Sequence, residues 1–366
     1  MNITFLIGNG FDLNLGLATK FNDFLKVYTK PTDSDSALIR AFKEHVLTEN
    51  ELWANAEMAF GQYTAAFNPT AEVTKTADDF CECYEHFCRE LASYLSKEEE
   101  RINFTSLSKF IGNVLPKSLL GYLSGFREVE KQSLLEAQKG VSGGEIFNFI
   151  NFNYTTTLDM CLAAIPKRDV MGTRTYGNTR YSNGIGTLIH VHGYTSHDMI
   201  LGVNDESQVA NSTLFDGYGP EYINEIIKVK ANAMAEQNTD EKAHSLLRTS
   251  DVIYIYGMSL GKTDILWWQR ICERLHKNPA LHVIIHCFDA PERTHFSRLH
   301  HKYAGDKRRE FVSYCDLPAD VKQQITQRIH IDDSNIFSKL YKLVEHSDNK
   351  PLSLEGTPEC PITNAS

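Results

Sequence analysis

The chain has 366 residues and a formal net charge of −10. This charge excludes a broad basic field of the kind that attracts DNA, RNA or an anionic membrane, so we expect no direct nucleic-acid binding. Hydrophobic residues make up 42% and charged residues 23% of the chain, which is typical of a globular protein with a sizeable core. No apolar run approaches the roughly 20 residues that span a bilayer, so no membrane partner is expected.

The N-terminus and the cysteines both favour the cytoplasm. Residues 1–8 lack the basic residues and the long apolar stretch of a signal peptide. The eight cysteines are scattered, and several lie in apolar runs, where free thiols behave as small hydrophobic residues. Cys81, Cys83 and Cys88, with His86, lack the spacing of a zinc site. We therefore expect a cytoplasmic protein with free thiols and no metal.

Six short apolar runs predict buried strands. They occupy residues 3–7, 146–152, 187–191, 199–203, 252–256 and 281–288. Four of them are followed directly by loops rich in Gly, Asn, His or Ser. In a mostly parallel sheet, such loops meet ligands at the carboxyl ends of the strands. We therefore predict an α/β, Rossmann-like fold with a mostly parallel sheet flanked by helices.

Two long stretches between these strands have helical periodicity and mixed charge. They cover residues 35–138 and 206–248. We interpret them as helical insertions into a discontinuous core of residues 1–34 and 139–340. The tail at 347–366 contains several Pro and Gly residues and is expected to be disordered.

The first predicted strand runs into a glycine-rich turn, Gly8-Asn9-Gly10, which is followed by Asp12. Glycine lets the backbone approach a phosphate closely, and N–H groups at the start of a helix bind anions. The next glycine, Gly16, comes six residues after Gly10, so the G-x-G-x-x-G spacing is not met and a plain tight turn is the alternative. A carboxylate is repelled by a diphosphate, so we interpret Asp12 as a helix cap or a partner of ribose hydroxyls.

Polar residues also follow two other predicted strands. Asn153 follows the strand at 146–152, and His192 follows the strand at 187–191. His190 and His192 point to one face by strand alternation, and His192 is nearer the carboxyl end, which makes it the better catalytic candidate. A hydrogen-bonded structural histidine and a turn-forming asparagine are the alternatives.

A second glycine loop, at residues 257–263, resembles a P-loop. It has three residues between its glycines instead of four. The cradle of N–H groups would not close around a β-phosphate with this spacing, so the loop argues against an NTPase.

Taken together, these motifs resemble the AbiH family of bacterial phage abortive-infection proteins. The resemblance is carried by residues 8–24, 151–155, 192–193 and 256–264, and it spans residues 1 to about 340. It implies a role in antiviral defence. It is compatible with a phage-derived trigger and with a homo-oligomer.

AbiH proteins are in turn distantly similar to sirtuin-like domains, which bind NAD. This similarity implies catalytic roles for Asn153 and His192. It implies cofactor-binding roles for Gly8, Asn9, Gly10, Asp12, Gly257, Ser259 and Asp264. Asp264 is interpreted either as a helix cap or as a second polar contact. Asp12 and Thr155 stand where the sirtuin-like pattern has serine and aspartate, and no paired C-x-x-C module follows His192, which argues against protein deacylation.

The activity that this similarity implies is hydrolysis of NAD+ to nicotinamide and ADP-ribose. Nicotinamide leaves as a neutral pyridine, so one base and one positioning group suffice, in contrast to the two carboxylates of ordinary glycosidases. We expect His192 to accept a proton and Asn153 to position the ribose and water. The alternatives are a non-catalytic sensor that binds NAD or a related adenine nucleotide, and a nuclease or nucleic-acid-binding toxin.

Overall fold

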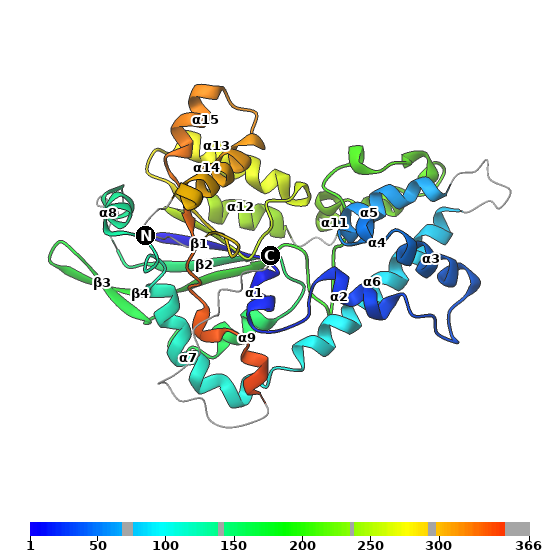
Figure 1. Ribbon diagram of the computed structural model, residues 1–366, viewed down its shortest axis with the longest axis horizontal. Helices are drawn as coiled ribbons and strands as arrows, with labels where there is room; N and C mark the ends of the chain where they lie inside the picture. The colour runs from blue at the N-terminus through cyan, green and yellow to red at the C-terminus, as the bar shows by residue number, and fades with distance from the viewer. Residues whose placement is uncertain (68–75, 138–142, 235–237, 292–297, 348–366) are drawn as a thin grey trace.

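The computed structural model describes residues 1–67, 76–137, 143–234, 238–291 and 298–347. At its centre lies a seven-stranded sheet in the order β3-β4-β2-β1-β5-β6-β7 (Figure 1). The strands are β1 (Asn2–Ile7), β2 (Ile146–Asn151), β3 (Gly172–Tyr176), β4 (Thr179–His190), β5 (Val252–Tyr256), β6 (His282–His286) and β7 (Ile329–Asp332). Neighbouring strands are parallel except β3, which is antiparallel to β4. The predicted α/β fold with a mostly parallel sheet is confirmed.

Five of the six predicted strands are present, and the strand predicted at 199–203 is wrong. Val203 forms only an isolated bridge with Ile227, and Leu201 and Val203 are buried against helices instead. An apolar run indicates burial but does not say which element covers it. The sequence analysis missed β3, which is polar, and β7, which has only four residues. The tail predicted to be disordered lies outside the described residues apart from Ser347.

Helices cover both faces of the sheet, as a parallel sheet requires. Phe5 and Tyr254 point into one core, and their neighbours Leu6 and Ile255 point into the other, in keeping with the two-residue period of a strand. The helices of the first core are α7 (Phe104–Leu120) and α9 (Thr157–Ala163). Those of the second core are α12 (Thr239–Thr249), α13 (Ile265–Lys277), α14 (Arg298–Ser313) and α15 (Ala319–Thr326).

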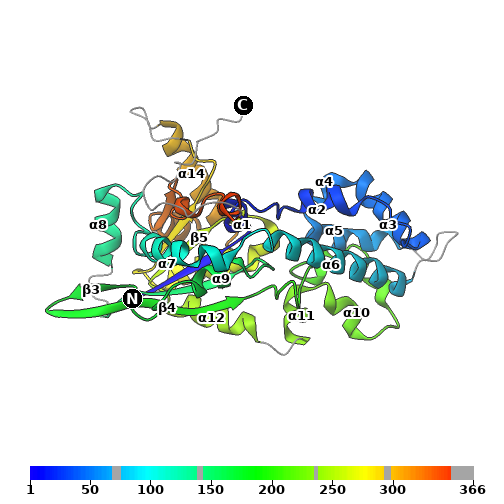
Figure 2. The same cartoon turned by 90° about the horizontal axis from the view of Figure 1, so that it is seen from below.

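A third core lies among helices beyond the carboxyl ends of the strands (Figures 1 and 2). We call these helices the helical layer. They are α2 (Phe21–Tyr28), α3 (Ala37–Thr48), α4 (Asn50–Trp53), α5 (Ala56–Tyr63), α6 (Ala77–Glu99) and α10 (Pro220–Glu225), with α11 (Lys228–Met234) packed against α10. Aromatic rings fill the core of the layer, for example Trp53 and Phe60, whose centroids are 4.9 Å apart in an edge-to-face pair.

Both stretches with helical periodicity therefore contain helices, and each is shared between the helical layer and the sheet. From the first stretch α7 packs on the sheet, and from the second α12 does so. The remaining α-helices of the described residues are α1 (Gly10–Asn14) and α8 (Glu128–Ala137). Short 3-10 turns lie at Thr64–Ala66, Glu206–Gln208, Ser212–Phe215, Lys262–Asp264, Ser338–Leu340 and Leu343–His346.

The strand order places a topological switch point between β1 and β5. After β1 the chain builds β2 and β4 on one side, and it later builds β5, β6 and β7 on the other. In open α/β sheets, ligands bind in the crevice outside the carboxyl ends of the strands at such a point. Gly8 follows β1 and Gly257 follows β5, so the two glycine loops flank this crevice.

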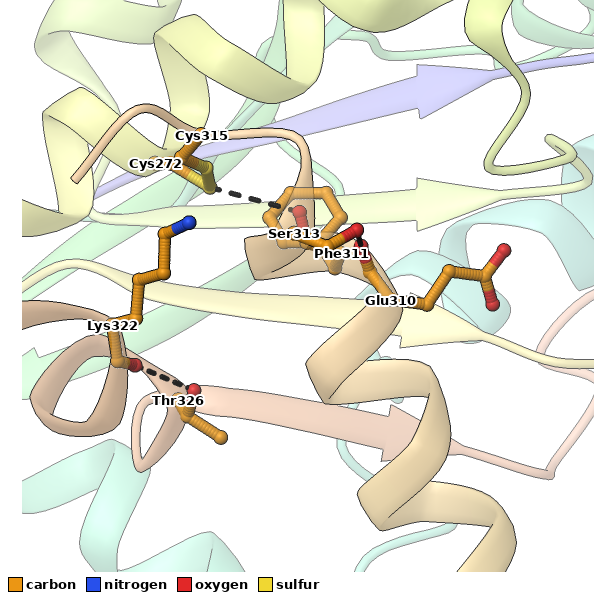
Figure 3. Close-up of a disulfide and its surroundings, with 7 residues drawn as sticks. All are labelled: Cys272, Glu310, Phe311, Ser313, Cys315, Lys322 and Thr326. Atoms are coloured by element: carbon orange, nitrogen blue, oxygen red, sulfur yellow. Dashed lines mark hydrogen bonds between the residues drawn. A yellow bond between two sulfur atoms is a disulfide. The ribbon is translucent and has the colours of Figure 1, made fainter. Parts of the chain in front are cut away.

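Two cysteines depart from the expectation of free thiols. Cys272 of α13 and Cys315, just after α14, form a disulfide within the second core (Figure 3). They are 43 residues apart in sequence, and only the packing of α13 against α14 brings them together. Separately, none of the helices among the described residues has the length and apolar character needed to cross a membrane.

Candidate functional site

Two cavities meet at the switch point. The smaller, of about 290 Å³, is bounded by the loops that follow β1, β2, β4 and β5 and by the helical layer. The larger, of about 1090 Å³, lies toward β5 and β6. Asn9, Gly257, Met258 and Ser259 line both. We call the smaller one the acidic cavity, because its charged lining residues are Asp12, Glu57 and Asp264, and the larger one the second cavity.

The glycine turn after β1 is packed tightly against the loop after β5. The Gly8 amide donates a 2.9 Å hydrogen bond to the Tyr256 carbonyl, and the Gly10 amide donates a 2.8 Å bond to the Gly257 carbonyl. A Cβ on Gly10 would lie 2.4 Å from Gly257 Cα. The close packing of the two loops therefore requires glycine at both position 10 and position 257. The amides of Gly8 and Gly10 are thus already used within the protein. Asn9 joins the two cavities, and its side chain bonds to Thr19.

Asp12 is buried in the wall of the acidic cavity. It lies inside α1, whose N-cap is Asn9, and its carboxylate accepts hydrogen bonds from the hydroxyls of Thr155 and Thr157. Burial raises the pKa of Asp12 to about 6, although the two hydroxyls oppose this shift. The interpretation of Asp12 as a helix cap is therefore wrong, because Asn9 is the N-cap and the Asp12 carboxylate binds two threonine hydroxyls.

Asn153 and His190 hold one another in place after β2. The Asn153 side-chain amide donates to the Gly8 carbonyl at 3.2 Å. His190 Nδ1 lies 3.2 Å from the Asn153 carbonyl, and His190 Nε2 lies 2.9 Å from Asp159 Oδ2. Both ring nitrogens thus face oxygen acceptors, so His190 connects the Asn153 loop to α9 and does not itself line the cavity.

His192 lines the acidic cavity together with Asn153. Its ring packs edge-to-face on Phe152, with centroids 5.4 Å apart. Burial lowers the pKa of His192 well below its ordinary range, and the positive charge of Lys228 lowers it further. The imidazole is therefore neutral at pH 7 and has a lone pair for accepting a proton.

Behind the cavity, a buried lysine joins the helical layer to the loop after β5. Lys228 Nζ lies 2.9 Å from Glu57 Oε2 and 3.7 Å from Asp264 Oδ1. It also donates to the Thr263 carbonyl at 3.3 Å. Asp264 occupies the N-cap position of α13, but its side chain makes no capping bond. Burial raises the pKa of Asp264, and Lys228 opposes this shift.

Comparison with known protein families identifies the family of this chain. The model of the family described as "Bacteriophage abortive infection AbiH" matches residues 4–286. The chain belongs to the AbiH family. No curated protein and no solved structure matches it.

The AbiH match includes two residues that were not predicted from the sequence, Glu57, which lines the cavity, and Lys228, which binds Glu57 from behind it. Each lies in a helical stretch of mixed charge, where an ionisable residue usually belongs to a solvated face. Their burial depends on the contact between the helical layer and the sheet. No local sequence pattern predicts that these two side chains are buried. Other cavity residues of this AbiH chain were candidates from the sequence alone. Three of them come from three separate loops and line one cavity, namely Asn153, His192 and Asp264.

Proposed function

We propose that this AbiH protein acts in phage defence by hydrolysing NAD+ at the bond between nicotinamide and ribose. Membership of the AbiH family supports the defence role. The observation that carries the proposed reaction is the meeting of Asn153, His192 and Asp12 in one cavity at the switch point of the sheet. Nucleotides bind at this place in doubly wound α/β folds.

The proposed reaction needs a positioned water and a neutral base. The bond between ribose C1′ and the pyridinium nitrogen breaks, and its electron pair stays with nicotinamide, which leaves as a neutral molecule. The oxygen of water bonds to C1′, and the water proton passes to neutral His192. The amide nitrogen of Asn153 is bonded to Gly8, which leaves its carbonyl oxygen as an acceptor for water or a ribose hydroxyl.

The departures from the sirtuin-like pattern contact each other, which supports the proposal. Asp12 stands where that pattern has a serine, and Thr155 where it has an aspartate. Thr155 Oγ1 donates to Asp12 at 2.6 Å, so a hydroxyl and a carboxylate are still paired here with their positions exchanged. The developing positive charge on the ribose would be stabilised by the Asp12 carboxylate.

The two cavities suggest how a dinucleotide would lie. The ribose and nicotinamide would occupy the acidic cavity, whose lining includes no Lys or Arg in the described part of the chain. The phosphates and adenosine would extend past Ser259 into the second cavity, whose lining, unlike that of the acidic cavity, includes the basic residues Lys20, Arg101 and Lys307.

The test is release of free nicotinamide from NAD+ by the purified chain and by cells infected with a phage that the protein restricts. We expect His192→Ala and Asn153→Ala to reduce the rate by about 100-fold or more. The control is Asn50→Ala at an exposed position of the helical layer. Full turnover in both cavity variants would rule out the residue assignment. Intact NAD+ in infected cells that the protein protects would rule out the activity.

A non-catalytic sensor is the second candidate. The helical layer supplies Glu57, Leu91 and Leu95 to the acidic cavity, so a bound nucleotide would contact both the sheet and the layer. Isothermal titration separates the candidates: a sensor binds NAD+ or ADP-ribose and leaves NAD+ intact in infected cells as well.

A further inference from the structure

The charges around the acidic cavity are one-sided. Three of its lining residues, Asp12, Glu57 and Asp264, carry carboxyl groups, and no Lys or Arg lines it among the residues that the structure describes. The second cavity is balanced, with three basic and three acidic lining residues, namely Lys20, Arg101, Lys307, Asp23, Asp289 and Glu310. An anionic group is therefore disfavoured in the acidic cavity, and a cationic group is favoured there.

The three carboxyl groups differ in how many hydrogen-bond and ion-pair partners they have. Asp12 accepts two hydroxyl hydrogen bonds. Glu57 binds Lys228 at 2.9 Å and accepts a weaker bond from Tyr154. Asp264 Oδ1 lies 3.7 Å from Lys228 Nζ and has no hydrogen-bond partner within the described residues. Oδ1 itself is buried, and the rest of the Asp264 side chain, which is 14% exposed, lines the cavity. Asp264 is therefore the carboxylate of this cavity with the fewest hydrogen-bond partners.

Lys228 compensates only part of this charge. It is shared between Glu57 and Asp264, so the three groups together carry one net negative charge when both carboxyls are ionised. An incompletely paired buried carboxylate is unfavourable until it meets a positive charge or hydrogen-bond donors. A cationic ligand group in the acidic cavity would supply that partner.

The walls of the acidic cavity also suit a flat ring. Phe21, Phe152 and Tyr154 are among its lining residues. Aromatic faces attract organic cations, and the attraction is stronger where water is excluded. A planar aromatic cation therefore matches both the aromatic lining and the charge of this cavity.

We propose that Asp264, held in place by Lys228 and Glu57, is the residue that recognises the positive charge of a pyridinium group in the acidic cavity. This inference deepens the proposed function and rests on it for the identity of the substrate. It assigns specificity for the oxidised dinucleotide, whose pyridinium is cationic, over the reduced one, whose ring is neutral. It also accounts for product release, because nicotinamide loses its positive charge when the glycosidic bond breaks.

The experiment compares two small probes that cannot be hydrolysed here, the cation 1-methylnicotinamide and neutral nicotinamide, by isothermal titration at pH 8. We expect the wild-type chain to bind the cation about 10-fold or more tightly than the neutral ring. Asp264→Asn, which keeps the shape and removes the charge, should reduce this preference several-fold. The matched control, Asp289→Asn, removes a carboxylate that lines the second cavity and should leave the preference unchanged.

Equal affinity of the wild-type chain for the two probes would overturn the inference, and this measurement needs no variant that might fail to fold. A folded Asp264→Asn chain with the full wild-type preference for the cation, or a loss of preference in Asp289→Asn alone, would also overturn it. The proposed hydrolysis is judged separately by nicotinamide release. A chain that prefers the cation but spares NAD+ would refute the hydrolysis and leave the recognition of the cation standing.

Discussion

Thr155 Oγ1 donates a 2.6 Å hydrogen bond to the carboxylate of Asp12, across 143 residues of sequence. The bond ties the turn after β1 to the loop after β2 at the edge of the acidic cavity. It keeps the Asp12 carboxylate in one orientation although burial favours its protonated form.

The raised pKa of Asp12 predicts a specific pH dependence of stability. Burial raises this pKa from 3.8 in the unfolded chain to about 6, so the folded state holds the proton more tightly. The contribution of Asp12 to stability is therefore greatest below pH 4 and is lost as the pH rises through 6. The free energy of unfolding of wild type minus that of Asp12→Asn should fall by on the order of 3 kcal/mol between pH 4 and pH 7. Urea unfolding at several pH values measures it, and a flat difference would contradict the shift.

Replacing Lys228 should destabilise the chain strongly. Lys228→Met leaves Glu57 and Asp264 buried without their cation, and removing one partner of a buried pair costs about 3–5 kcal/mol. The loss should shrink toward pH 5, because burial raises the pKa of Asp264 and this carboxyl becomes protonated. Lys230→Met is the matched control, because its ion pair with Glu206 is exposed and contributes at most about 1 kcal/mol. Similar losses in the two variants would argue against the buried cluster.

A methyl group on Gly10 should disrupt the contact between the two glycine loops. Its Cβ would lie 2.4 Å from Gly257 Cα, and we expect Gly10→Ala to lower the free energy of unfolding by about 1–3 kcal/mol. Gly305→Ala is the control, because this position lies within α14 and the nearest atom to its Cβ is the mobile end of Arg309 at 3.4 Å. That substitution should stabilise the helix by about 0.5–1 kcal/mol. Thermal unfolding measures the stability of both variants. A Gly10→Ala chain as stable as wild type would contradict the close packing of the two loops.

His190 should matter for stability through its two acceptors. His190→Ala removes the ring contacts with the Asn153 carbonyl and the Asp159 carboxylate, which predicts a loss of about 1–3 kcal/mol. His301→Ala on the exposed surface of α14 is the control and should stay within about 0.5 kcal/mol of wild type. Chemical denaturation measures both. If His190→Ala were as stable as the control, the ring would not be bridging the two loops.

Local patterns were enough to predict the central strands and two of the residues in the cavity. β1, β2, β5 and β6 consist mostly of apolar residues because both faces of a parallel sheet are covered by helices. Asn153 and His192 were predicted at strand ends, and strands that run parallel bring their carboxyl ends to one edge. That geometric rule placed both side chains in one cavity although 39 residues separate them in the chain.

The amino-acid sequence by itself thus determined the type of sheet, the positions of five of its seven strands and the edge at which polar loops gather. Tertiary structure alone decided that the run at 199–203 packs among helices, that Cys272 meets Cys315, and that Lys228 reaches Glu57 and Asp264. The physical reason is that periodicity reports whether a residue is buried, whereas the identity of its partner depends on how separately formed layers pack together.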